Sequence, residues 1–223
     1  MKRKNKQPEQ KQTRSAGSRI IKSTFSRENI EAIVIAVVLA LFIRAFIVQA
    51  FKIPSGSMEP TLLIGDHILV NKFIFGIKIP FIDKKALRFT SPERGDVVVF
   101  IYPGDPSKDY IKRVVGIAGD TIKIRNKRVY INDKPASDEH AFFSDTKSHE
   151  QWRVAPHRDN YGPITVPKDS LFVMGDNRDK SYDSRFWGFV NVNKVKGQAF
   201  LIYWSWEKPF RNFRWRRLAQ VIH

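Results

Sequence analysis

Two hydroxyl side chains stand close together in a short, turn-rich segment of this chain, residues 53–62 (IPSGSMEPTL). Pro54 and Gly56 accompany Ser55 and Ser57, so the segment cannot continue a helix and leaves backbone N–H groups beside a possible nucleophile. A reaction centre built on a serine needs such a loop. Taken alone, the segment is also compatible with an ordinary turn, so its interpretation depends on partners elsewhere in the chain.

A candidate base for that serine lies in residues 109–120, which alternate in strand fashion up to a glycine turn. Lys112 stands there among hydrophobic neighbours. On a solvent-facing strand it would be an ordinary surface lysine. If it is buried, desolvation disfavours the ammonium form, and the neutral amine can act as a general base. The five histidines offer no local triad signature, so a Ser–Lys pair is the simpler chemistry.

A third polar segment, residues 175–188 (GDNRDKSYDSRFWG), follows an apolar strand at 171–174. It does not fit a calcium loop that starts at Asp179, because Ser184 would replace the glycine at position 6 and Val190 the glutamate at position 12. A structural loop closed by Asp183 and Arg185 remains as an alternative. Neither a metal nor another cofactor is predicted. The absence of cysteine excludes disulfides, thiolate catalysis and cysteine-ligated zinc.

The rest of the chain predicts a mainly β fold. Short runs rich in β-branched and aromatic residues are separated by Gly, Pro, Asp and Asn, and lie at 69–72, 96–102, 110–115, 121–124, 128–131, 170–174 and 198–204. We expect an antiparallel β-sheet catalytic domain with a β-hairpin at 124–129. The polar stretch 136–167 indicates an excursion with little core, so we expect a small inserted cap at about residues 124–170.

The N-terminal region predicts a membrane anchor. Residues 1–28 contain nine Lys or Arg and two Glu, a net charge of +7, and form a basic tail in a chain of net charge +17. Residues 29–50 are mostly apolar, and a helix over 30–48 would rise roughly 28 Å, close to the ~30 Å hydrocarbon core of a bilayer. A cleaved secretory signal ending at Val48-Gln49-Ala50 is the alternative, but Arg44 is unfavourable in a signal core. The basic tail then places the N-terminus in the cytoplasm and residues 51–223 across the membrane.

Taken together, these segments resemble the type I signal peptidases, membrane-bound Ser/Lys proteases that remove signal peptides from exported precursors. The resemblance covers about residues 30–205 and rests on four motifs in family order, at 53–62, 65–66, 110–113 and 175–185. It implies Ser57 as nucleophile and Lys112 as general base, with the Ser55 hydroxyl and the Ser57 N–H holding the oxyanion. It also implies that Ser181 orients the Lys112 amine while Asp183 and Arg185 brace the loop.

The resemblance further implies a preference for small side chains at positions −1 and −3 of the substrate. The residues expected to line those shallow apolar pockets are Phe51, Ile53, Pro54, Met58, Leu62, Tyr110 and Ile111. The implied partners are signal-peptide-bearing precursors and membrane lipid. The implied location is the bacterial inner membrane, with a single span and an extracytoplasmic catalytic domain. Many relatives have two spans where this chain has one, and the interval 117–174 is short, which suggests a reduced cap.

Two other interpretations compete with this one. Interleaved aromatic and arginine residues at 210–217 (FRNFRWRR) are compatible with a tethered nucleic-acid-binding module. We prefer an interfacial patch that meets lipid headgroups, because the predicted anchor separates this segment from cytoplasmic nucleic acid, and we expect no nucleic-acid partner. A self-cleaving Ser/Lys regulator of related fold is weakened by the anchor and by the lack of an obvious DNA-binding domain.

Overall fold

The computed structural model describes residues 27–78, 85–87, 89–144, 157–207 and 212–223. Nearly all of the predicted basic tail, and parts of the segments 136–167 and 210–217, lie outside these ranges. The chain divides into two units, residues 1–43 and 44–223, and each is described by itself.

The described part of the first unit is helix α2, Arg27–Phe42, whose apolar side chains are all exposed. A π-helical turn, Ile43–Ile47, follows, and strand β1 begins at Val48. The observed helix is therefore shorter than the predicted 29–50, because residues 48–50 pair with a neighbouring strand. Within the described residues, none of the helices combines the length and the apolar character that a membrane crossing requires.

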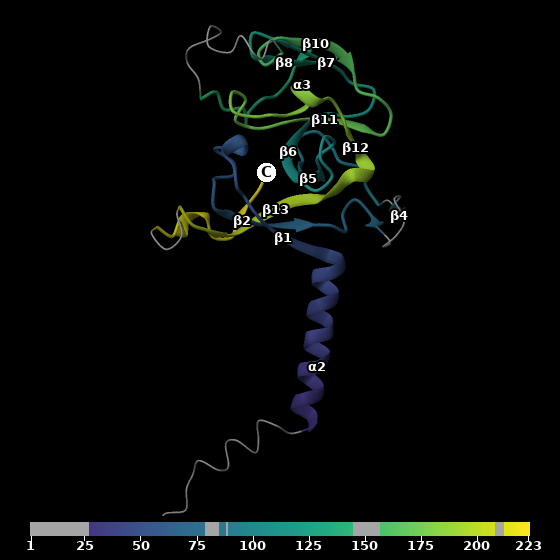
Figure 1. Ribbon diagram of the computed structural model, residues 1–223, viewed down its shortest axis with the longest axis vertical. Helices are drawn as coiled ribbons and strands as arrows, with labels where there is room; N and C mark the ends of the chain where they lie inside the picture. Colours follow the sequence, from purple (N-terminus) through teal and green to yellow (C-terminus); the bar gives the residue numbers. More distant parts are fainter. Residues whose placement is uncertain (1–26, 79–84, 88, 145–156, 208–211) are drawn as a thin grey trace, which may run out of the picture. The chain divides into compact units, whose positions relative to one another are not determined.

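The second unit is built on a large antiparallel sheet. Among the described residues, eight strands form it in the order β1-β2-β13-β5-β6-β11-β12, with β14 paired to β13 (Figure 1). Their bounds are β1 Val48–Lys52, β2 Asp66–Asn71, β5 Val97–Ile101, β6 Asp109–Gly116, β11 Ser170–Met174, β12 Val190–Asn191, β13 Val195–Ser205 and β14 Gln220–Val221. A separate two-stranded pair joins β3, Ile77–Lys78, to β4, Lys85–Leu87. The predicted mainly antiparallel β fold is confirmed.

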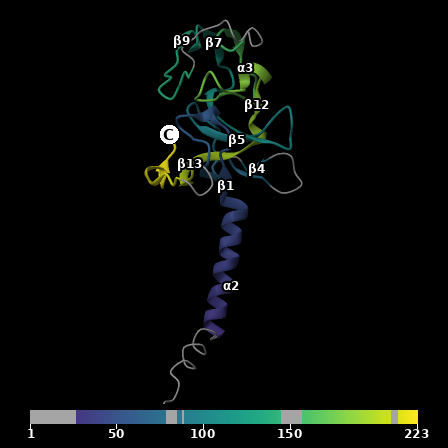
Figure 2. The same cartoon turned by 60° about the vertical axis from the view of Figure 1, so that its left-hand side comes forward.

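A second sheet forms the cap, which we define as the described residues 121–144 and 157–165. Its described strands run in the order β10-β7-β8-β9, with bounds β7 Thr121–Arg125, β8 Arg128–Ile131, β9 Lys134–Pro135 and β10 Tyr161–Thr165. The predicted hairpin at 124–129 is present as β7 and β8, joined by a two-residue turn. Figures 1 and 2 both place α3, Ser184–Trp187, between the cap sheet and the lower strands of the main sheet.

The cap has more core than its polar sequence indicates. Ile122, Ile124 and Val129 from its strands pack against Phe172 and Met174 of β11, and all five are almost fully buried. Burying an aliphatic or aromatic side chain of this size contributes about 1.5–3 kcal/mol. The two sheets therefore share a hydrophobic core, which makes the cap a fixed part of the domain.

Candidate active site

The structure brings Ser57 and Lys112 together from elements 55 residues apart. Ser57 lies in a 3-10 turn, Gly56–Met58, that follows β1, and Lys112 lies on β6. The Lys112 Nζ donates a hydrogen bond of 2.7 Å to Ser57 Oγ and another of 3.1 Å to the Ile111 carbonyl. Both residues are buried. At this distance the same pair can exchange a proton in the opposite direction once the amine is neutral.

Burial sets the charge state of this amine. Desolvation is the largest influence and lowers the pKa of Lys112 from 10.5 to about 8. The nearby charges of Asp183 and Asp176 act in the opposite direction, and the Arg185 charge acts in the same direction as burial. With a pKa of about 8, roughly a tenth of Lys112 is a neutral amine at pH 7, a few hundred times more than for an unperturbed lysine, and this neutral form is the one that a general base requires.

The segment that carries Ser57, the nucleophile turn (residues 53–62), is held mainly by backbone and apolar contacts. The Ile53 N–H donates to the Asp66 carbonyl and the Gly65 N–H donates to the Ile53 carbonyl, at 2.8 and 2.9 Å. Met58 and Leu62 are fully buried in a core cluster with Ile68 and Val70 of β2. The turn is thus anchored by side chains that point away from the serine hydroxyl.

The 175–185 loop lies against this turn. Asp183 caps α3 and pairs with Arg185 through hydrogen bonds of 2.9 Å to both carboxylate oxygens, while its Oδ2 also accepts from the Gly175 N–H. Burial by itself would raise the pKa of Asp183, but the Arg185 charge and these hydrogen bonds lower it overall. The Ser181 hydroxyl is buried beside Asp183. Within the described residues it makes no hydrogen bond of good geometry, but it is close enough to the Asp183 carboxylate to help lower the pKa of that group.

Gly175 brings the loop and the turn into contact. A Cβ added at Gly175 would overlap with the Ser181 hydroxyl and with the Ser57 carbonyl oxygen. Only glycine therefore lets the Ser181 side of the loop approach the Ser57 backbone this closely.

A cavity of about 640 Å³ opens onto the dyad. Its walls include Pro54 and Ser55 from the nucleophile turn, Tyr110 and Ile111 from β6, and Tyr182 from the 175–185 loop. Ser55 is exposed beside Ser57, on the side of the turn that faces this cavity. The site thus combines a buried Ser–Lys pair with a groove able to admit an extended chain.

A family model described as signal peptidase, peptidase S26, matches residues 26–204. The chain belongs to this family. Signal peptidase I of Pseudomonas aeruginosa is 39% identical, over 77% of this chain and 70% of the relative. That of Pseudomonas fluorescens is 40% identical with the same coverage, and probable signal peptidase I-2 of Synechocystis sp. is 38% identical over 78% and 71%. The chain is accordingly a serine peptidase of the signal peptidase I type.

The predicted pocket residues of this peptidase divide into two groups. Pro54, Tyr110 and Ile111 line the cavity, and Ile111 also packs against the core cluster beside it. The side chains of Ile53, Met58 and Leu62 belong to that core cluster, and Phe51, on β1, is partly buried against it. As wall residues Ile53, Met58 and Leu62 are corrected, because these apolar side chains are buried in the core, and Phe51 is not among the residues that line the cavity.

Sequence reasoning assigned no role to several residues that hold the site together. Asp176, fully buried, accepts two hydrogen bonds from Arg113 (2.8 and 2.7 Å) and one from Thr61 (2.6 Å). The Asn177 N–H donates to the Ser57 carbonyl and its amide Nδ2 to the Gly56 carbonyl, at 3.2 and 3.3 Å. Arg113 and Asp176 lie within the motifs 110–113 and 175–185, so the sequence marked both residues, but it did not indicate that they pair with each other.

The aromatic and arginine segment near the C-terminus is only partly available for binding. Arg217 pairs with the buried Asp66 at 2.6 Å, and Arg214 donates to the Ile64 carbonyl at 3.1 Å. Phe213 packs between Trp204 and Trp215, with ring centroids 4.4 and 4.2 Å apart, and Trp215 remains 73% exposed. Two of its arginines therefore stabilise the fold, which weakens the interpretation of this segment as a nucleic-acid site.

Proposed function

We propose that this chain is a membrane-anchored serine endopeptidase that cleaves signal peptides from exported precursors after small residues at −3 and −1, using a Ser57/Lys112 dyad. Membership in the signal peptidase family supports the substrate class. The observation that carries the mechanism is the buried 2.7 Å contact between Lys112 Nζ and Ser57 Oγ.

In the first step, the neutral Lys112 amine takes the Ser57 proton while Oγ attacks the scissile carbonyl carbon. The resulting ammonium then gives its proton to the leaving amine, and the C–N bond breaks to leave an acyl-enzyme. In the second step, Lys112 takes a proton from a water molecule whose oxygen attacks the ester carbonyl carbon. The bond from that carbon to Ser57 Oγ then breaks, the Lys112 ammonium returns the proton to Oγ, and the signal peptide leaves with a new carboxyl group. The lowered pKa of Lys112 suits both steps, because the same group must accept and donate a proton near neutral pH.

The oxyanion of each tetrahedral intermediate is held by the Ser55 hydroxyl and the Ser57 N–H. A single donor of this kind is typically worth about 2.7–4 kcal/mol of transition-state stabilisation. Ser181 orients the Lys112 amine, and its buried hydroxyl lies where the 175–185 loop meets the Ser57 backbone, which supports that role. Asp183 and Arg185 brace the loop that carries it.

Substrate selection follows from the groove. An extended peptide lies along it, and Pro54, Tyr110 and Ile111 leave room only for small side chains near the scissile bond. Main-chain hydrogen bonds to a strand edge tolerate varied sequences, which suits an enzyme that processes many precursors.

The apolar part of residues 29–50 that precedes strand β1 holds the enzyme at the bacterial inner membrane as a single span, with the basic tail 1–28 in the cytoplasm and residues 51–223 on the extracytoplasmic side. The apolar side chains exposed along α2 and the excess of positive charge before it support this arrangement. The exposed Trp215 and its aromatic neighbours provide a second contact with lipid headgroups.

The decisive test is cleavage, in detergent or lipid vesicles, of a purified precursor with Ala at −3 and −1 by the parent chain and by Ser57→Ala. Product from the parent alone, cut after the −1 Ala, supports the proposal. A folded parent that forms no product would refute it.

For Ser181→Ala we expect a lower kcat with little change in KM, and an unchanged kcat would remove Ser181 from the mechanism.

A further inference from the structure

Contacts from the cap reach the 175–185 loop on both sides of Ser181. Before Ser181, the Lys127 Nζ pairs with Asp179 Oδ1 at 2.8 Å. Arg178, next to Asp179, forms two hydrogen bonds with the Asp138 carboxylate, at 2.8 and 2.7 Å. After Ser181, the Arg185 Nη1 donates to the carbonyl of Arg158 at 2.9 Å. The cap is thus connected to the loop by these two ion pairs and by the hydrogen bond from an arginine to a backbone carbonyl.

A further connection runs from the cap to the nucleophile turn. Phe142 pairs with the loop through two backbone hydrogen bonds, from its N–H to the Asp176 carbonyl (2.7 Å) and from the Arg178 N–H to its own carbonyl (2.8 Å). Ser144 Oγ lies 3.2 Å from Asn177 Oδ1, and Asn177 in turn bonds to the carbonyls of Gly56 and Ser57. A displacement of the cap would therefore shift both the backbone at Ser57 and the loop that carries Ser181.

The ion pairs Lys127–Asp179 and Asp138–Arg178 connect the cap directly to the loop, and the carboxylate of the first is the more deeply buried. The Asp179 side chain is 2% exposed, whereas that of Asp138 is 25% exposed. Loss of this ion pair would remove one stabilising partner from a buried carboxylate and so weaken the connection between the cap and the loop. Lys127 is also held from the cap side, with its Nζ 5.6 Å from the centre of the Phe143 ring.

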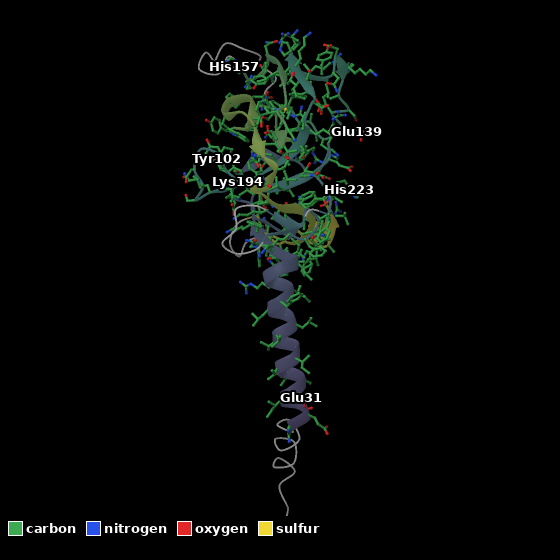
Figure 3. The ribbon with its side chains drawn as sticks, turned by 90° about the vertical axis from the view of Figure 1, so that its right-hand side faces the viewer. Glu31, Tyr102, Glu139, His157, Lys194 and His223 are labelled. Atoms are coloured by element: carbon green, nitrogen blue, oxygen red, sulfur yellow. The ribbon has the colours of Figure 1, made fainter. Side chains whose placement is uncertain are left out.

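The backbone at Lys127 gives independent support. The β7–β8 hairpin turn has positive φ at both central residues, 48° at Asn126 and 69° at Lys127. Such turns strongly favour Asn followed by Gly, and a residue with a Cβ in the left-handed region costs roughly 1–2 kcal/mol. A lysine kept where glycine would be more stable indicates that its side chain has a function. Figure 3 labels His157, the residue at which the described chain resumes, near the top of the domain as drawn.

We propose that the cap is a positioning element for the catalytic dyad, and that Lys127 acts through Asp179 to hold Ser181 in place beside Lys112. The inference rests on the proposed function, because it assigns Lys127 and Asp179 to the same Ser/Lys reaction. Neither residue touches substrate. Their effect is to keep the 175–185 loop closed over the lysine amine, so that water does not enter and the amine stays desolvated.

The test uses the full-length chain in detergent and compares Lys127→Gly/Asp179→Asn with Lys127→Arg and Arg128→Met. The double variant relaxes the strained turn and removes the buried charge, so it is expected to keep the unfolding midpoint of the parent. Its kcat is expected to fall about tenfold with little change in KM, as for a misplaced catalytic group. The acid limb of its pH profile should move to higher pH, because a looser loop admits water to Lys112. Lys127→Arg keeps the ion pair and should retain most of the parent kcat.

Arg128→Met is the matched control, since Arg128 is the next residue of the same hairpin and is exposed. It should leave kcat and the acid limb unchanged. A double variant that folds and keeps both the kcat and the acid limb of the parent would overturn the role of the cap, as would a lower unfolding midpoint with unchanged kinetics. If the double variant does not fold, Asp179→Asn alone replaces it, because this substitution keeps the shape of the side chain. We then expect a smaller fall in kcat and a smaller shift of the acid limb to higher pH. A folded parent that cuts no precursor would instead overturn the proposed function.

Discussion

The two segments that meet at the dyad are held by different forces. The nucleophile turn, 53–62, is anchored by Ile53, Met58 and Leu62 in the hydrophobic core and by backbone hydrogen bonds. The 175–185 loop is anchored by ion pairs whose carboxylates are largely buried, Asp176 with Arg113, Asp179 with Lys127 and Asp183 with Arg185. One side of the site is fixed by apolar packing and the other by charge.

This difference has a chemical consequence for Lys112. Uncompensated carboxylates next to the amine would favour the ammonium form and make it useless as a base. Because Asp176 and Asp183 are each paired with an arginine, they can shape the loop while desolvation still lowers the pKa of Lys112 to about 8. Packing under Ser57 adds no charge at all to this environment. The arrangement therefore allows a rigid site around a neutral lysine.

The largest loss of cleavage rate is expected from a substitution of Lys112, the residue next to which both segments lie. Lys112→Arg keeps the length and positive charge but removes the neutral amine, so cleavage should fall on the order of 10³-fold or more. Initial rates on a precursor with Ala at −3 and −1 measure this, with Ser57→Ala as the blank. Turnover within tenfold of the parent would contradict the general-base role of Lys112.

Separating the two segments should have the next largest effect. In Gly175→Ala, the new methyl group overlaps with the Ser181 hydroxyl and the Ser57 carbonyl, so one of them must move. We expect kcat to fall about 10²-fold, the typical cost of a misplacement of about 1 Å. Gly119→Ala is the control, because a Cβ there meets open space at a φ of +90° and can lower stability only through the backbone. Equal losses of activity in the two variants would contradict the steric argument.

Removing a charge should affect the pH dependence as well as the stability. In the parent, kcat/KM should rise with pH and level off above about 8, since the neutral form of Lys112 accumulates through that pKa. Arg185→Met leaves Asp183 unpaired and removes a cation, both of which raise the pKa of Lys112. The acid limb should therefore move to higher pH, and unfolding should become easier by about 3–5 kcal/mol. If the acid limb of a folded Arg185→Met variant stays near pH 8, Arg185 does not influence the pKa of Lys112.

Removing packing should affect stability alone. Met58→Ala deletes a fully buried side chain beneath Ser57 and should cost about 2–5 kcal/mol of the free energy of unfolding. Below its unfolding temperature, the acid limb should remain near that of the parent, because no charge has changed. Urea unfolding and the pH profile of kcat/KM test this together, and a shifted limb would show that the apolar side of the site also tunes Lys112.

Much of the site was predictable from local patterns. The Ser57 turn, the lysine strand and the 175–185 loop each have residues whose types restrict their conformation, and the strands at 128–131 and 170–174 were predicted with the observed bounds. Strand β1 was not predicted, because Val48 directly continues the apolar run and neither Gln49 nor Ala50 marks a turn before the β conformation. The cap sheet was missed in part because β9 and β10 contain proline and glycine and depend on their partners for pairing.

The sequence by itself determined which groups could react, since a serine in a Pro/Gly turn and a lysine in an apolar strand are local properties, and with its ordered motifs it determined the family. Only the tertiary structure decided that Ser57 and Lys112 lie 2.7 Å apart, that Asp176 pairs with Arg113, and that Lys127 of the cap reaches Asp179. The physical reason is that desolvation and ion pairing depend on neighbours from distant parts of the chain. Those neighbours lower the pKa of Lys112 from its ordinary value, and no local pattern records them.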